Sequence, residues 1–95
     1  MNGREARRVD AYKETFARRL TAARKGRRVS RRTLSELCGL HPDAVRRYER
    51  QEAVPMLPAA AAIADYLNVS LDWMIGRTDV PRCPPADDVP PYQRF

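Results

Sequence analysis

The feature that most constrains this chain is a pair of short helical patterns separated by a break, in SRRTLSELCGLHPDAVRRYER (30–50). Apolar residues recur there at helical spacing, stop at Gly39 and resume after Pro42. Glycine is favoured just past the end of a helix, and proline at the first position of the next one. We therefore expect two short helices joined by a tight turn, with Ser30 capping the first and His41 weakly capping the second.

The apolar residues of these two helices predict how they pack. Leu34, Leu37 and Cys38 form the stripe of the first helix, and Val45 and Tyr48 that of the second. Ser35 is small and should let the two helices approach each other. Splitting one helix in this way leaves a face of the second piece free of the core and exposed on the surface. The pattern is that of a helix-turn-helix.

Three further helices and no strands are expected around this pair. A helix over 10–25 has one apolar face and a basic one, and Gly26 should end it in the left-handed conformation. A helix over 57–67 should stop at Asn68. Ser70 should cap a short helix that ends at Gly76. The predicted fold class is all-α, with five helices.

The apolar residues also predict where the folded domain begins and ends. Leu, Ile, Val and Phe number only 18 of 95 residues, but 14 of them lie between 16 and 75, where Met56, Tyr66, Trp73 and Met74 can join the core. The segment 77–95 contains five prolines and little to bury. We therefore expect a basic N-terminal arm over 1–10, one domain over 11–76 and an extended Pro-rich tail over 77–95.

The charge of the chain is strongly asymmetric. Residues 1–35 carry 12 Lys or Arg against 3 acids, whereas residues 36–95 carry 6 against 9. Such a concentration of positive charge favours a polyanionic partner. No apolar run is long enough to span a membrane, and the first ten residues hold no apolar stretch that could act as a signal. We expect a cytoplasmic protein that does not bind membranes.

At this point the sequence resembles the Cro and phage-repressor class of DNA-binding domains, the Xre-type helix-turn-helix family. The segments that carry the resemblance are VSRRTLSELCGL, VRRYERQEAVP and IADYLNVSLDWMIGRTD. It implies a compact lambda-repressor-like domain whose third helix lies in the major groove, while the start of the second helix contacts the DNA backbone. Two positions depart from the family: Arg31 replaces a usual glutamine, and His41 a usual serine or threonine.

The exposed face of the third helix carries the candidate base contacts, which are Pro42, Asp43, Arg46 and Arg47. Arg47 is the first candidate because an arginine can donate two hydrogen bonds to guanine, although it could be an ordinary solvated arginine. Asp43 could hold Arg47 in position, accept from cytosine, or simply stabilise the helix dipole.

The candidate phosphate contacts are arginines around the same two helices. Arg46 is an alternative member of this group, and Arg4, Arg7 and Arg8 of the arm could either bind DNA or only add solubility. Such contacts supply affinity rather than specificity. The candidates are Arg28, Arg31, Arg32 and Arg50.

A single recognition helix reads only a few base pairs, so a two-fold homodimer on a palindromic operator is expected. Trp73 and Met74 of the fifth helix are the candidate dimer contacts, although Trp73 could equally belong to the core.

The leading functional hypothesis is a sequence-specific regulator of transcription that binds double-stranded DNA, a repressor of phage, prophage or bacterial origin. The alternatives are an antitoxin or interaction module whose tail binds a partner protein, and a nonspecific architectural protein. An enzyme is not expected, because no nucleophile and base stand at a recognisable spacing. Cys38 and His41 offer two ligands where a structural zinc needs four, so neither a metal nor a cofactor is expected.

Overall fold

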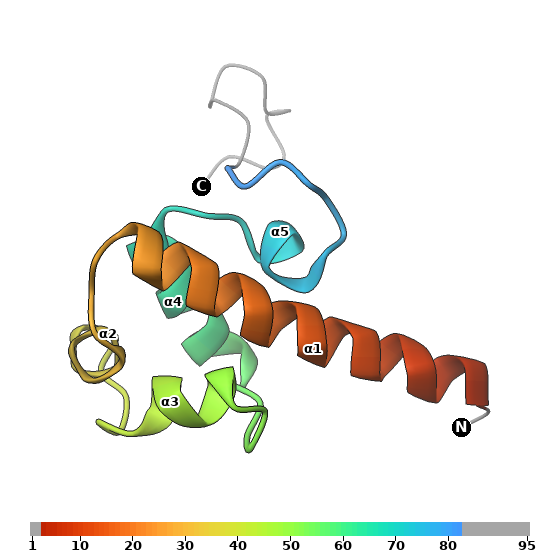
Figure 1. Ribbon diagram of the computed structural model, residues 1–95, viewed down its shortest axis with the longest axis horizontal. Helices are drawn as coiled ribbons and strands as arrows, with labels where there is room; N and C mark the ends of the chain where they lie inside the picture. The colour runs from red at the N-terminus through yellow and green to blue at the C-terminus, as the bar shows by residue number, and fades with distance from the viewer. Residues whose placement is uncertain (1–2, 83–95) are drawn as a thin grey trace.

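The protein is described by a computed structural model that covers residues 3–82, with side chains from residue 8 onward. Within that range every regular element is a helix, so the predicted all-α fold of five helices is confirmed. Figure 1 shows α1 as a long rod, with α2 and α3 toward its C-terminal end; α1 packs against α5 and α3, and α4 against α5. The helices are α1 (Gly3–Gly26), α2 (Arg31–Leu37), α3 (Ala44–Glu49), α4 (Leu57–Leu67) and α5 (Leu71–Ile75).

Most predicted helix ends are confirmed. The hydroxyls of Ser30 and Ser70 each accept a backbone N–H three residues later, which satisfies a donor that the first turn of a helix leaves free. Asn68 and Gly76 both adopt the left-handed conformation and end α4 and α5. These signals are local, and the structure follows them.

Helix α1 differs from the prediction at both ends. It begins at Gly3 rather than Asp10, so residues 3–10 continue the helix instead of forming a separate arm. Gly26 lies inside the helix, and Arg28 takes the left-handed conformation that we expected of Gly26. The backbone N–H of Val29 then donates to the carbonyl of Arg24, which turns the chain toward α2.

The core lies between α1 and the other four helices. Leu37, Met56 and Tyr66 were expected to contribute to it, but all three are exposed. Cys38, Leu40 and Tyr48 are half-buried at its edge. The largest fully buried side chains besides Ser35 are Leu20, Leu34, Val45, Ile63 and Met74.

The chain after α5 is not extended from Arg77 onward, as the proline content suggested. The Arg19 guanidinium donates to the carbonyls of Trp73 and Thr78 at 2.6 and 2.8 Å and pairs with Asp79 at 3.0 Å. The backbone N–H of Ser70 donates to the Pro81 carbonyl at 2.7 Å. Residues 77–82 are therefore folded back on α1 and the start of α5, and the rest of the tail lies outside the described residues.

No helix of the described part is long and apolar enough to cross a membrane. Between residues 3 and 82, no group of three or more histidine, cysteine or acidic side chains is placed to hold a metal ion.

Candidate nucleic-acid interface

Helices α2 and α3 are joined by the tight turn that the sequence predicts. Gly39 has a φ of 72°, in the left-handed region that side chains disfavour. Its N–H donates to the Glu36 carbonyl, and that of Leu40 donates to the Ser35 carbonyl at 2.8 Å. These bonds close the end of α2 and direct the chain into α3 at an angle, so the predicted helix-turn-helix geometry is present.

Ser35 does more than provide space between the two helices. Its side chain is fully buried, and its hydroxyl donates to the Arg31 carbonyl at 2.8 Å. The same oxygen accepts the backbone N–H of Val45 at 3.0 Å. Because Val45 lies in the first turn of α3, this bond satisfies one of the free donors of that helix from inside α2. The sequence indicated only that the residue is small.

Helix α3 begins at Ala44, two residues later than predicted, so Pro42 is a turn residue rather than the first helical one. The Nδ1 atom of His41 accepts the N–H of Asp43 at 3.1 Å, and its carbonyl accepts that of Ala44 at 2.9 Å. His41 thus holds the turn before α3, but the N-cap residue is Asp43 and no side chain caps the helix, so the expectation that His41 is the cap is wrong.

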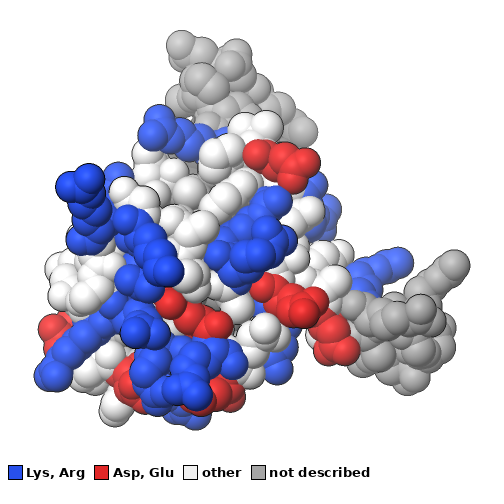
Figure 2. Space-filling view, viewed as in Figure 1, with Lys and Arg blue, Asp and Glu red and all other residues white. Residues whose placement is uncertain are grey.

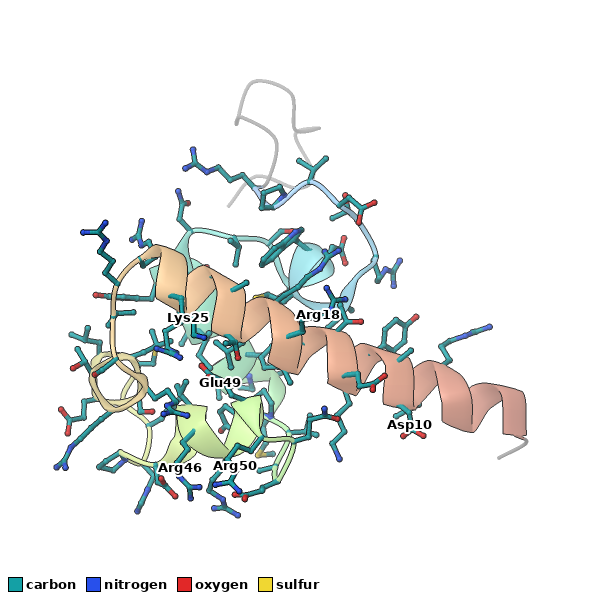
Figure 3. All side chains as sticks on the ribbon, in the orientation of Figure 1. Asp10, Arg18, Lys25, Arg46, Glu49 and Arg50 are labelled. Atoms are coloured by element: carbon teal, nitrogen blue, oxygen red, sulfur yellow. The ribbon has the colours of Figure 1, made fainter. Side chains whose placement is uncertain are left out.

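An ion pair that the sequence did not reveal fixes α3 against α1. The Arg24 guanidinium donates to both carboxylate oxygens of Glu49, at 2.6 and 3.2 Å, and to the Val29 carbonyl at 3.0 Å. The two side chains are only 11% and 6% exposed. Figure 3 shows Glu49 on the side of α3 that faces α1, with Arg46 and Arg50 on the opposite side. The pair therefore orients α3 so that its arginines face solvent.

The acids on the outer face of α3 pair with Arg46. Both carboxylate oxygens of Asp43 accept from Arg46, at 2.5 and 2.6 Å, so the suggested alternative in which Asp43 holds Arg47 is not the arrangement found. The Arg46 hydrogen bond, with help from the charge, holds the pKa of the Asp43 carboxyl below its usual 3.8. Asp43 raises the pKa of Arg46 in return. Arg47 is exposed, and no ion pair among the described residues involves it.

The candidate phosphate contacts surround α3. Arg28, Arg31, Arg32 and Arg50 are all exposed. Two of them have surface ion partners, Arg32 with Glu36 at 3.0 Å and Arg50 with Glu52 at 3.5 Å. Figure 2 shows basic side chains gathered over the end of the molecule formed by α2 and α3, with a few acids between them.

A hollow of about 410 Å³ lies between the starts of α2 and α3. The structure brings together around this hollow three candidate base contacts, Pro42, Asp43 and Arg46, and the two candidate phosphate contacts at the start of α2. Its walls are Ser30, Arg31, Arg32, Pro42, Asp43 and Arg46. Arg47 does not line it and instead lines a separate hollow between α3 and the α3–α4 connection.

The structure does not leave the two candidate dimer residues free. Met74 is fully buried in the core, so it offers no surface to a second copy, and this expectation is corrected. Trp73 is half-buried, and the Arg19 guanidinium carbon lies 4.9 Å from the centre of its ring. The cation covers the indole face that the fifth helix was expected to present. Helical spacing alone could not tell which side of a five-residue helix faces the core.

Comparison with known proteins agrees with this geometry. A family model described as "Helix-turn-helix" matches residues 20–74, which is more than half of the chain and includes α2 to α4 and most of α5. No curated protein and no solved structure matches the chain. The family comprises regulators of transcription that bind DNA and are generally not enzymes. The buried serine and the ion pair to α1 hold α2 and α3 in the geometry that defines it, and the chain belongs to the Cro/C1-type helix-turn-helix family.

Proposed function

We propose that the protein is a sequence-specific repressor that reads the major groove of double-stranded DNA with α3. The observation that carries the proposal is that Arg47 is exposed and has no ion-pair partner among the described residues. This side chain is exposed on the second helix of the motif, while the acids of that face pair with Arg46 and Arg50. A guanidinium without a carboxylate partner can donate two hydrogen bonds to guanine O6 and N7 without first breaking an ion pair.

The other arginines serve two different purposes in this proposal. Arg31 and Arg32 stand at the start of α2 beside the hollow that reaches α3, where a phosphate group can contact both helices. Arg28, in the turn before α2, and Arg50, just after α3, are also exposed and can add phosphate contacts. Arg46 must exchange part of its bond to Asp43 for any DNA contact, so it serves mainly to hold Asp43 away from the phosphates.

Repression follows from occupancy, because a small domain bound across a promoter blocks access to it. Since α3 is only six residues long, one copy can read only a few base pairs. We therefore propose that two copies bind a palindromic operator, with half-sites about one helical turn apart.

The test is selection of bound sites from a random duplex pool at near-physiological salt, followed by titration of the selected site. Arg47→Ala should relax the preference at one base pair per half-site and cost about 1 to 3 kcal/mol on the selected site. Arg31→Ala should instead weaken selected and scrambled duplexes alike and lower the salt slope by about 0.9.

Arg77→Ala is the matched control, since it removes the same charge from the segment after α5, away from α2 and α3. It should leave the base preference unchanged. Steep salt dependence with no enriched sequence would refute specific recognition and indicate architectural binding.

A further inference from the structure

The hollow that Arg47 lines differs in character from the hollow between the starts of α2 and α3. It has a volume of about 230 Å³ and lies between α3 and the connection that leads to α4. Apart from Arg47, His41 and Tyr48, every described residue that lines it is apolar. The hollow between α2 and α3 is instead lined mainly by charged side chains. The Arg47 guanidinium is therefore a permanent charge in a largely apolar setting.

The connection after α3 is held against the backbone of Arg47. The N–H groups of Glu52 and Ala53 donate to the Arg47 carbonyl at 2.9 and 3.4 Å. Figure 1 shows the chain turning back beside the end of α3 before it enters α4. Val54 and Met56 follow in this connection and line the same hollow as Arg47. Two apolar side chains are thus placed on one flank of α3, next to the candidate guanine contact.

These two side chains are exposed although they are apolar. Val54 is 60% exposed and Met56 is 81% exposed. Exposed apolar side chains that lie together beside polar groups mark interaction sites. Glu52, the acid of the connection, does not line the hollow and lies 3.8 Å from Arg46 and 3.5 Å from Arg50. The surface around Arg47 can therefore approach DNA without a carboxylate that would repel the phosphates.

We infer that Val54 and Met56 contact the 5-methyl group of a thymine next to the guanine that Arg47 contacts. The base edges of the major groove are otherwise hydrogen-bond donors and acceptors, and the thymine methyl is the apolar group that they offer. A guanine beside a thymine therefore matches a guanidinium set beside apolar side chains. The inference rests on the proposed function, because it requires α3 in the major groove. It adds one base to each half-site, and two residues outside α3 that determine specificity.

The test compares thymine with uracil in the selected duplex, because the two bases differ only in the methyl group. The guanine is identified first, as the base whose preference Arg47→Ala relaxes. With the full chain, replacing the neighbouring thymidine by deoxyuridine should weaken binding about fourfold per half-site, the factor expected for exposing one buried methyl group. Replacing thymidines farther from that guanine should leave the affinity unchanged.

Protein variants assign the effect to the two side chains. Met56→Gln and Val54→Ser should each bring the ratio of the affinities for thymine and uracil duplexes toward one, and either variant is sufficient if the other fails to fold. Leu57→Gln is the matched control, since Leu57 is the next residue, is 72% exposed and lies outside this hollow. That variant should keep the wild-type ratio.

The outcomes separate this inference from the proposed function. A selected site that depends on Arg47 but has no thymine next to the guanine, or binds equally well with uracil there, overturns the inference and leaves the proposed function standing. A ratio that both hollow variants leave at its wild-type value also overturns it, because the methyl group then contacts another part of the protein. If no sequence is enriched, the proposed function and this inference are both refuted.

Discussion

Replacing Glu49 by glutamine should destabilise the protein strongly, although glutamate and glutamine have nearly the same shape. The change leaves the Arg24 guanidinium buried without an anion, at a position where it is 11% exposed. Removing one partner of such a pair costs about 3 to 5 kcal/mol. A domain of this size has about 5 to 15 kcal/mol of total stability, so the loss removes a large share of it. The midpoint of thermal unfolding should fall by more than about 10 °C.

The measurement is urea unfolding, followed both by helical circular dichroism and by the fluorescence of Trp73, the only tryptophan. Glu36→Gln is the matched control. It makes the same chemical change in a pair with Arg32 whose side chains are 77% and 52% exposed, so it should cost less than about 0.5 kcal/mol. A loss below about 1 kcal/mol for Glu49→Gln would show that water reaches Arg24 freely and would refute the reasoning.

Three further changes test other parts of the domain. Ser35→Ala should cost about 1 to 3 kcal/mol in urea unfolding, because the Val45 N–H is left buried without an acceptor. Gly76→Ala should cost more than Gly39→Ala, although both glycines have positive φ, because only at Gly76 would the new Cβ meet Thr15, at 3.1 Å; equal losses would contradict the close packing of α5 on α1. Asp43→Asn should lower the free energy of unfolding by a constant amount above a pH of about 5. This loss should shrink as the pH falls below 3.8 and through the lowered pKa of folded Asp43, because Asp43 stabilises the fold only while it is ionised. Acid titration of both proteins checks this.

The elements that the sequence predicted well are those set by short-range chemistry. A serine with a free hydroxyl before an apolar run caps a helix wherever it occurs, so the starts at Ser30 and Ser70 are confirmed. Gly39, Asn68 and Gly76 take the left-handed conformation for an equally local reason. Helix α4 could be predicted to the residue because proline and asparagine bound a continuous run of good helix formers.

The predictions that fail are those that depend on a distant contact. Arg28 rather than Gly26 takes the left-handed conformation because the turn must bring Val29 to the carbonyl of Arg24. Asp43 has arginines three and four residues after it, and spacing allows either pair. The non-helical φ and ψ of Asp43 differ from those that the i, i+4 rule assumes, and Arg46 is the partner.

The same reasoning explains why the candidate site could be proposed from the sequence but its supporting residues could not. An exposed arginine on the second helix of the motif can be proposed from the sequence, because its role does not depend on a contact with a distant part of the chain. Arg24 and Arg19 look identical to it there, yet one orients α3 through a buried carboxylate 25 residues away and the other holds the segment after α5. Of the many arginines in this basic chain, the candidate DNA contacts can therefore be separated from those that hold the fold only once burial is known. Salt should weaken the contacts of the exposed arginines far more than those of Arg19 and Arg24, since screening acts much less on buried charges.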